Sequence, residues 1–459
     1  MAERLVVVGG DAAGMSTVSQ ARRRRTADDL EIVAFERGSF TSYSACGIFY
    51  WVGGEVDDRD ELIARRPEVF REKLAIDVRL RQEVVAIDTD RRTVTARDLT
   101  AGTEHETAYD QLMIATGASP LRPGIPGIGA DGVFGIQTLD DGQHVIDALR
   151  DRAPRTAVVI GAGYIGLEMA EAMCRRGLTV HVVEAGPRPM ATIDVELGDR
   201  IADAMRGAGV ELHLGVAVTA IEAADDGWVT EVVTEDGALP CDLVVLGTGT
   251  RPNSDLGRDG GLPVGSSGGL VVDRRQRTPV DGVWAAGDCA ETFHRVSRRP
   301  VSFALGTIAN KQGRVAGINL GGGYETFPGV LGTTMTRVCG LEIARTGLGG
   351  AEAVAAGFEP VTALVNSTTR AHYYPDANEL TIKIVAERGS GRLLGAQIVG
   401  EEGAAKRIDG FALALWNEMD VGELLNVDLA YAPPFSPVWD PVLIAARKAW
   451  QAIEADRAS

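Results

Sequence analysis

One cysteine and two glycine-rich loops are the residues of this chain best suited to chemistry. Cys46 lies between the loops Gly9–Gly14 and Gly161–Gly166, and each loop follows a short apolar run and opens a helical pattern. Free N–H groups at the start of such a helix hold a pyrophosphate, and the glycines let the backbone approach it closely. Two loops therefore predict two bound dinucleotides, and the cysteine between them indicates electron transfer to sulfur.

Each loop belongs to a strand–helix–strand pattern that ends in an acidic residue. The first pattern ends at Glu36 and the second at Glu184. A carboxylate at this point of a dinucleotide-binding fold accepts a hydrogen bond from a ribose hydroxyl and would repel a 2′-phosphate. We therefore expect the second site to favour NADH over NADPH, although Arg188 is close enough in sequence to permit dual use.

The elements that position these loops follow one plan through most of the chain. Apolar strands alternate with helical patterns, which is typical of parallel sheets covered by helices in an α/β fold. Two further strands, at 109–117 and 242–249, end at Thr-Gly turns, and we expect both to complete the first domain. The second nucleotide domain would then be inserted into the first, and a C-terminal α+β domain would follow. The predicted boundaries are 1–118 together with 245–325 for the first domain, 119–244 for the second domain, and 326–459 for the C-terminal domain.

Composition narrows the class of protein and its partners. A chain of 459 residues that is 45% hydrophobic and 24% charged is globular and long enough for two or three domains. A net charge of −18 argues against nucleic-acid and anionic-membrane partners. The sequence shows neither a membrane-spanning stretch nor a signal-peptide core, so we expect a cytoplasmic protein. Five cysteines without a CxxC pair predict no disulfide framework, and we expect no metal.

Four motifs in a fixed order make the chain similar to a known family. They are the two glycine loops, the turn Ala115–Gly117 and the segment Ala285–Asp288. This order resembles the pyridine nucleotide-disulfide oxidoreductases, homodimeric flavoproteins with two Rossmann-like domains and a dimerisation domain. The resemblance implies FAD in the first domain and NAD(P)H in the second, with Asp288 on the ribityl chain. The implied cofactor-binding residues are Gly9, Gly10, Ala13, Gly14, Glu36, Thr116, Gly117, Asp288, Gly161, Gly163, Tyr164, Ile165, Gly166, Glu184 and Gly249.

The first loop departs from the family fingerprint at Asp11, which stands at the middle glycine position. A carboxylate that faces a pyrophosphate would repel it. We therefore expect the Asp11 side chain to turn away from the cofactor and to cap the following helix.

The cysteine pattern selects a branch of this family. The residue five positions after Cys46 is Trp51, so the chain has no CxxxxC dithiol. It resembles the single-cysteine branch, which contains coenzyme A disulfide reductases, NADH oxidases and NADH peroxidases. Members that reduce oxygen or peroxide carry a histidine in the first loop, where this chain has Ala12. The resemblance is therefore greatest to the coenzyme A disulfide reductases.

The C-terminal third strengthens this resemblance. In coenzyme A disulfide reductases, tyrosines at positions matching Tyr373 or Tyr374 and Phe435 reach the cysteine of the partner subunit. Tyr373 or Tyr374 is therefore expected to donate a proton to the leaving thiolate. Phe435 replaces the second tyrosine, and Ala45 replaces an asparagine that helps to hold coenzyme A. The implied substrate-binding residues are Gln20, Arg23, Ser42, Asn310, Tyr431 and Phe435.

The resemblance implies a mechanism centred on Cys46. Hydride from NAD(P)H reduces FAD, the flavin reduces a mixed disulfide on Cys46, and the freed thiolate attacks the next small disulfide. Because a free thiol is mostly protonated at neutral pH, we expect the helix after Cys46 and the flavin to lower its pKa. The other cysteines, Cys174, Cys241, Cys289 and Cys339, are interpreted as packing residues. NAD(P)H oxidase, polysulfide or persulfide reductase, and a flavin-bearing redox partner stay open as alternatives.

Overall fold

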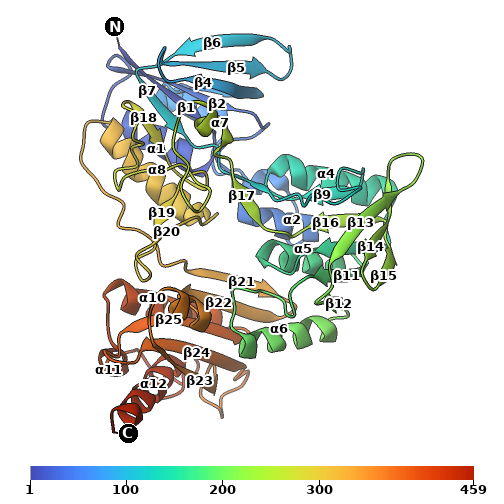
Figure 1. Cartoon of the computed structure of the whole chain (residues 1–459), viewed down its shortest axis with the longest axis vertical. Coiled ribbons are helices and arrows are strands. Elements are labelled where there is room, and N and C mark those ends of the chain that lie inside the picture. Colours follow the sequence, from blue (N-terminus) through green and yellow to red (C-terminus); the bar gives the residue numbers. More distant parts are fainter. Residues whose placement is uncertain (1, 459) are drawn as a thin grey trace.

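The computed structural model describes residues 2–458, which form three domains (Figure 1). The first domain lies at one end of the long axis, the second beside it, and the third at the opposite end. Helices cover parallel sheets in the first two domains, whereas the sheet of the third is antiparallel. The predicted fold class, two Rossmann-like domains and a C-terminal α+β domain, is therefore confirmed.

The first domain is built on a five-stranded parallel sheet in the order β18-β7-β1-β2-β3. The central strand β1 is buried over Leu5–Val8, which explains its continuous apolar run. Its sheet strands are β1 (Glu3–Val8), β2 (Leu30–Glu36), β3 (Asp77–Leu80), β7 (Gln111–Ile114) and β18 (Val283–Ala285), with an antiparallel sheet of β4 (Gln82–Asp88), β5 (Thr93–Asp98) and β6 (Glu104–Ala108). Its helices are α1 (Ala12–Arg22), α2 (Ile48–Gly53), α3 (Pro67–Leu74), α7 (Asp255–Asp259) and α8 (Gly306–Leu320).

The second domain repeats this plan with the strand order β12-β11-β10-β16-β9. A small antiparallel sheet of three strands packs on one face of the parallel sheet, through a shared apolar cluster. The parallel strands are β9 (Val133–Gly135), β10 (Thr156–Ile160), β11 (Thr179–Glu184), β12 (Glu211–Leu214) and β16 (Leu243–Leu246), and the antiparallel ones are β13 (Val218–Ala223), β14 (Val229–Thr234) and β15 (Gly237–Pro240). The helices are α4 (Leu139–Arg152), α5 (Tyr164–Arg175) and α6 (Val195–Gly207).

A two-stranded ribbon joins the first two domains. β8 (Ala118–Pro120) carries the chain into the second domain and pairs antiparallel with β17 (Thr250–Pro252), which carries it back. The second domain is thus inserted into the first. The predicted return at residue 245 is wrong, because β16 pairs with β10 and β9 inside the second sheet. The boundary lies at the ribbon.

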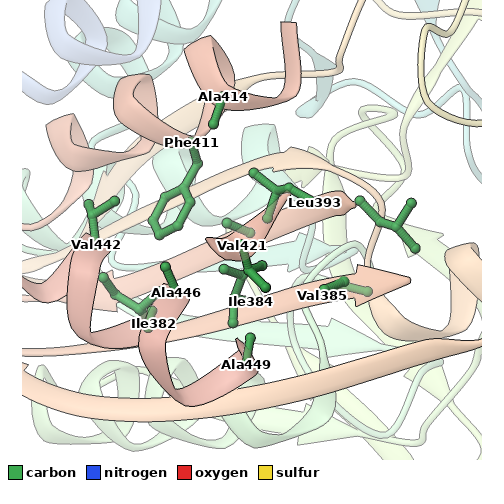
Figure 2. Close-up of a cluster of buried hydrophobic side chains, with 14 of the residues drawn as sticks. Ile382, Ile384, Val385, Leu393, Phe411, Ala414, Val421, Val442, Ala446 and Ala449 are labelled. Atoms are coloured by element: carbon green, nitrogen blue, oxygen red, sulfur yellow. The ribbon is translucent and has the colours of Figure 1, made fainter. Parts of the chain in front are cut away.

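The third domain contains a five-stranded antiparallel sheet in the order β21-β22-β25-β24-β23. Figure 2 shows Phe411 of α10 and Val442 and Ala446 of α12 gathered above Ile382 and Ile384 of β24. The spacing of the buried residues along α12 matches one face of a helix. The elements are β21 (Thr334–Val338), β22 (Leu341–Gly347), β23 (Pro360–Thr368), β24 (Glu379–Glu387), β25 (Leu393–Gly400), α9 (Gly350–Ala355), α10 (Ile408–Trp416), α11 (Val421–Leu425) and α12 (Pro441–Ala458).

A buried ion pair joins the second and third domains. Lys383 Nζ of β24 lies 2.8 Å from a carboxylate oxygen of Asp194 and 2.8 Å from one of Glu196, both at the start of α6. The amide of Gln397 accepts a hydrogen bond from the backbone N–H of Asp194 at 2.7 Å. These polar contacts fix α6 against the sheet of the third domain.

Short elements complete the described part of the chain. They are the 3₁₀ turns Ala45–Gly47, Arg59–Leu62 and Ala405–Arg407, and the strands β19 (Thr292–Phe293) and β20 (Pro300–Val301). None of the described helices combines the length and apolar character needed to cross a membrane.

Candidate active site

The first glycine loop lets the chain pass tightly between β1 and α1. Gly9 has φ +111°, and a Cβ there would lie 2.1 Å from the carbonyl oxygen of Ala115. A Cβ on Gly14 would lie 1.9 Å from the carbonyl oxygen of Gly9. The loop therefore needs glycine at both positions, and the helix that follows points its N-terminus toward the loop.

The second loop has the same construction. Gly161 has φ +97°, and a Cβ on Gly166 would lie 2.0 Å from its carbonyl oxygen. Gly163 precedes α5, which begins at Tyr164. The Tyr164 hydroxyl lies 2.7 Å from Thr334 Oγ1 of β21, so this helix is anchored to the third domain.

The two strand-end acids are held in the same way. Glu36 accepts hydrogen bonds from the backbone N–H of Gly10 at 2.7 Å and of Gly38 at 2.6 Å. Glu184 accepts them from Ala162 and Gly186, both at 2.7 Å. Each carboxylate is thereby fixed beside its glycine loop, in the position from which a ribose hydroxyl can be bound.

A cavity of about 410 Å³ opens at the first loop. Its lining includes Gly9, Ala13, Glu36, Thr116, Gly117 and Asp288. Asp288 Oδ1 is buried and has no hydrogen-bond partner among residues 2–458, and burial raises the pKa of this carboxyl to about 6. A buried acceptor without a partner fits a hydroxyl donor of a bound molecule. The cavity, the loop and Asp288 together fit FAD.

Asp11 behaves differently from the expectation. Its side chain makes no capping hydrogen bond to α1 but accepts one from the backbone N–H of Tyr43 at 3.1 Å. It lines the FAD cavity, and burial raises its pKa to about 7, with Glu36 and Asp288 adding to the rise. At a pKa of about 7 the carboxyl is ionised in only about half of the molecules at neutral pH, so it repels a pyrophosphate less than a fully ionised aspartate would.

Cys46 lies in the turn Ala45–Gly47 directly before α2 and is exposed. Although the residue is accessible to solvent, partial burial of its thiol raises the pKa, and the carboxylates of Glu168 and Asp288 add to the rise. The expected lowering of this pKa is therefore wrong for the protein's own groups. The helix that follows has only six residues, and its dipole is small against the two acids.

The interpretation of the other four cysteines as packing residues agrees with their surroundings. Cys241 and Cys289 are buried, and Cys174 and Cys339 are half-buried. Burial raises the pKa of each thiol, which suits an unreactive side chain.

Sequence reasoning missed Glu168, the charged residue that contributes most to raising the pKa of Cys46. It lies on α5, accepts a hydrogen bond from Thr336 Oγ1 at 2.6 Å, and has a pKa raised to about 7 by burial. Its spacing of four residues from Tyr164 places both on one helix face, which was the available signal. Glu168 thus belongs to the second domain, accepts a hydrogen bond from the third, and acts electrostatically on the Cys46 thiol of the first.

The aromatic residues expected near the thiol lie in the third domain. Tyr373 and Tyr374 occupy the loop between β23 and β24, and Tyr431 and Phe435 precede α12. Tyr373 is 67% and Phe435 77% exposed, and Tyr431 hydrogen-bonds to Tyr373, which raises the Tyr431 pKa. The described residues show no hydrogen bond from this group to Cys46 of the same chain.

The remaining expected substrate residues lie on α1, on α8 and in the loop after β2. Ser42 donates its backbone N–H to the Gly10 carbonyl at 3.2 Å and lies at the first loop. Asn310 accepts a hydrogen bond from Ser16 Oγ at 2.7 Å, which joins α8 to α1. Gln20 and the exposed Arg23 lie at the far end of α1.

Gly249 lies next to the ribbon that joins the first two domains, and Ile165 lies at the end of the second glycine loop. Gly249 has φ +93° and its carbonyl accepts a hydrogen bond from the Leu121 N–H at 2.9 Å, beside the connecting ribbon. Ile165 is half-buried in the first turn of α5. Arg188, which could have met a 2′-phosphate, is paired with Asp199 at 2.6 Å.

Two dinucleotide folds, a cavity that fits FAD and an exposed cysteine beside it define a flavin-dependent oxidoreductase. The chain belongs to the pyridine nucleotide-disulphide oxidoreductase family, whose model matches residues 3–313 and whose dimerisation-domain model matches 334–441. Membership implies FAD and NAD(P)H as cofactors.

Relatives of different activity resemble this chain over almost its whole length. It is 39% identical to an NAD(P)H sulfur oxidoreductase (CoA-dependent) of Pyrococcus abyssi, covering 96% of this chain and 97% of the relative. It is 33% identical to an NADH oxidase of Methanocaldococcus jannaschii, covering 97% and 98%. The crystal structure of reduced Bacillus anthracis CoADR-RHD matches with a TM-score of 0.95 and 32% identity, covering 99% of this chain and 81% of that one.

Proposed function

We propose that this protein uses NAD(P)H and FAD to reduce sulfur–sulfur bonds of small thiol compounds through Cys46. The observation that carries the proposal is the position of Cys46, which is exposed, directly follows Ala45 of the FAD cavity lining, and is under the electrostatic influence of Asp288 and Glu168. No second cysteine is near enough in sequence to form a dithiol with it. The substrate class is low-molecular-weight disulfides such as coenzyme A disulfide, and it extends to persulfides and polysulfides, in agreement with the name of the Pyrococcus relative.

The proposed reaction has two half-reactions, and Cys46 takes part in both. The Cys46 thiolate attacks one sulfur of the substrate, the S–S bond breaks, and the other sulfur takes up a proton and leaves as a thiol. Cys46 then holds the first sulfur in a mixed disulfide. FAD held by the first glycine loop and Asp288 would supply the two electrons, taken from NAD(P)H, that return Cys46 to thiolate and, with a proton, release the second thiol.

Proton supply is assigned to tyrosines of a second copy of the chain. Tyr373 and Tyr374 are exposed on the third domain and, among residues 2–458, make no hydrogen bond to the Cys46 of their own chain. In a homodimer either one can donate a hydrogen bond to the leaving sulfur, with Tyr431 orienting Tyr373. Phe435 offers an apolar contact but no proton.

The nicotinamide site favours NADH. Glu184 is held at the loop by two backbone N–H groups and would repel a 2′-phosphate. Arg188 does not offset this repulsion, because its guanidinium is already paired with Asp199. NADH is therefore the expected electron donor, with NADPH as the weaker one.

The test compares electron acceptors in the flavin-loaded enzyme. We expect rapid anaerobic NADH oxidation with coenzyme A disulfide or a persulfide, and at least about a thousandfold loss in Cys46→Ser, because the nucleophile is removed. Cys174→Ser, which alters a half-buried cysteine, is the matched control and should retain the rate. Turnover in air alone, unaffected by Cys46→Ser, would contradict the proposal and establish the oxidase.

That oxidase is the second candidate because the Methanocaldococcus relative carries this name. Ala12 opposes it, since no imidazole stands in the first loop to meet oxygen or peroxide beside the flavin.

A further inference from the structure

Two histidines and a glutamate meet on the edge of the second domain, away from the glycine loop. His181 lies on β11, and Glu211 and His213 lie on the edge strand β12. The parallel register pairs His181 with Glu211 and Val183 with His213, so the three side chains emerge on one face. Among the described residues they are the group whose ligand atoms all lie within 4.8 Å of one another.

The Nδ1 atom of His181 lies close to both of the other ligand atoms. His181 Nδ1 is 3.2 Å from His213 Nε2 and 3.3 Å from an Oε atom of Glu211. A neutral His181 has at most one proton on Nδ1, and that proton cannot fully satisfy both acceptors. A cation bound between the three ligand atoms would satisfy all three lone pairs at once.

From this geometry we propose that His181, Glu211 and His213 bind a divalent transition-metal ion, with Zn²⁺ as the best match. Ligand atoms around a tetrahedral zinc are about 3.3–3.4 Å apart, given metal–nitrogen distances near 2.05 Å. Both measured separations, 3.2 and 3.3 Å, lie close to that value. Two imidazoles with one carboxylate suit zinc and its neighbours, whereas Mg²⁺ and Ca²⁺ prefer oxygen ligands alone.

The surroundings favour a stable site that solvent can reach. The His181 side chain is only 15% exposed and fixed on a paired strand, whereas that of Glu211 is 60% exposed. Metal can therefore enter from the Glu211 side, and a water molecule can complete the fourth position. Asp236, in the turn between β14 and β15, adds a negative charge near His213.

A metal bound by these three residues would stiffen the part of the second domain that binds the nucleotide. β11 ends at Glu184, and the chain after β12 donates backbone hydrogen bonds back to this region, from Val216 to Glu184 at 3.1 Å and from Gly215 to Gly186 at 2.8 Å. A metal that joins β11 to β12 therefore restrains the two segments that carry the ribose-binding loop. It plays no part in the chemistry at Cys46.

The test is zinc binding to the untagged, flavin-loaded protein after treatment with a chelator. We expect one Zn²⁺ per chain by isothermal titration, no comparable Mg²⁺ binding, and at least about a tenfold loss of affinity in His181→Gln and Glu211→Gln. His144→Gln changes an exposed histidine on α4 and is the matched control that should bind like the wild type. Glu211 is exposed, so its variant should fold even if His181→Gln does not.

X-ray absorption of the zinc-loaded protein separates this site from the cysteines. Nitrogen and oxygen ligands with imidazole scattering would support the assignment. Sulfur ligands, an affinity unchanged by both variants, or no zinc binding at all would each overturn it. Activity is not the readout, so failure of the proposed reductase function would leave this test intact.

Discussion

The reactivity that we propose for Cys46 rests on its position, because the electrostatics of the protein alone oppose formation of its thiolate. Glu168 and Asp288 both oppose its ionisation, and both carboxyls have raised pKa values of about 7 and 6. Each group is therefore partly neutral near physiological pH, and the thiol meets less negative charge than full ionisation would give. As pH rises these carboxyls ionise and oppose formation of the thiolate, so the thiolate fraction rises less steeply with pH than that of an isolated thiol.

Replacing Glu168 by Gln should lower the pKa of Cys46. The glutamine keeps the hydrogen bond from Thr336 but removes a charge that raises the thiol pKa. We expect the midpoint of the iodoacetamide alkylation rate against pH to move to lower pH. The effect should be largest above pH 7, where Glu168 is ionised, and small at pH 6. Equal alkylation profiles would show that Glu168 does not act on the thiol.

At the scale of elements, the glycine loop controls the FAD cavity through its backbone. Gly9→Ala would put a Cβ 2.1 Å from the Ala115 carbonyl oxygen and force the loop apart. We expect the purified variant to carry less than about a tenth of the wild-type flavin, because the displaced N–H groups no longer meet the pyrophosphate. Absorbance of the bound flavin measures this directly.

A matched control separates the clash from the cost of the left-handed backbone. Gly177 has φ +83°, and a Cβ added there would have no other group within 4 Å. Gly177→Ala therefore incurs only the conformational cost, about 1–2 kcal/mol, and should retain its flavin. Loss of flavin in both variants, or in neither, would refute the role given to the Gly9 contact.

The glycine loops and the strands beside them could be predicted because their signals are local. A buried strand followed by glycines at fixed spacing needs no distant partner to be recognised. The predicted return of the chain at residue 245 is wrong for the opposite reason: β16 and β7 both end at a Thr-Gly turn, and only pairing with β10 assigns β16 to the second sheet. An apolar pattern identifies a strand, but it does not show to which sheet that strand belongs.

Long-range contacts explain the site residues that the sequence did not reveal. Glu168 meets Thr336 across 168 positions, and the histidine cluster depends on the register of β11 against β12. The capping role predicted for Asp11 is wrong for the same reason, because the Tyr43 N–H that holds its side chain comes from a separate loop. Such groups have ordinary local patterns in the sequence, and only the fold brings them together.

At the scale of the whole molecule, the third domain supports the second. The Lys383 ammonium is buried between Asp194 and Glu196, and tyrosine and glutamate side chains of α5 contact β21. Burial is the largest single influence and opposes ionisation of Asp194, but the hydrogen bond and charge of Lys383 and the hydrogen bond from the Gly350 N–H together outweigh it and lower the pKa of Asp194. This pairing therefore contributes stability above the unfolded pKa of Asp194, and that stability is lost as pH falls through the lower folded value.

The exposed aromatic residues of the third domain indicate where a second copy binds. Tyr373, Phe435, Val438 and Trp439 are all well exposed, which is unusual for so many large apolar side chains on one domain. The match of this domain to the family's dimerisation model identifies the partner as another copy of the chain. A symmetric dimer would then use the same surface twice.

Mixed dimers test whether the active site is built from both copies. Cys46→Ser and the double variant Tyr373→Phe/Tyr374→Phe should each have low disulfide reductase activity, the second by about 10–100-fold from loss of the proton donor. After the two are unfolded together and refolded with FAD, half of the dimers are expected to be mixed. Each mixed dimer pairs an intact Cys46 with intact tyrosines at one of its two sites, so about a quarter of wild-type activity should return. If the tyrosines act on the cysteine of their own chain, mixing restores nothing, and the activity stays at the average of the two variants refolded apart.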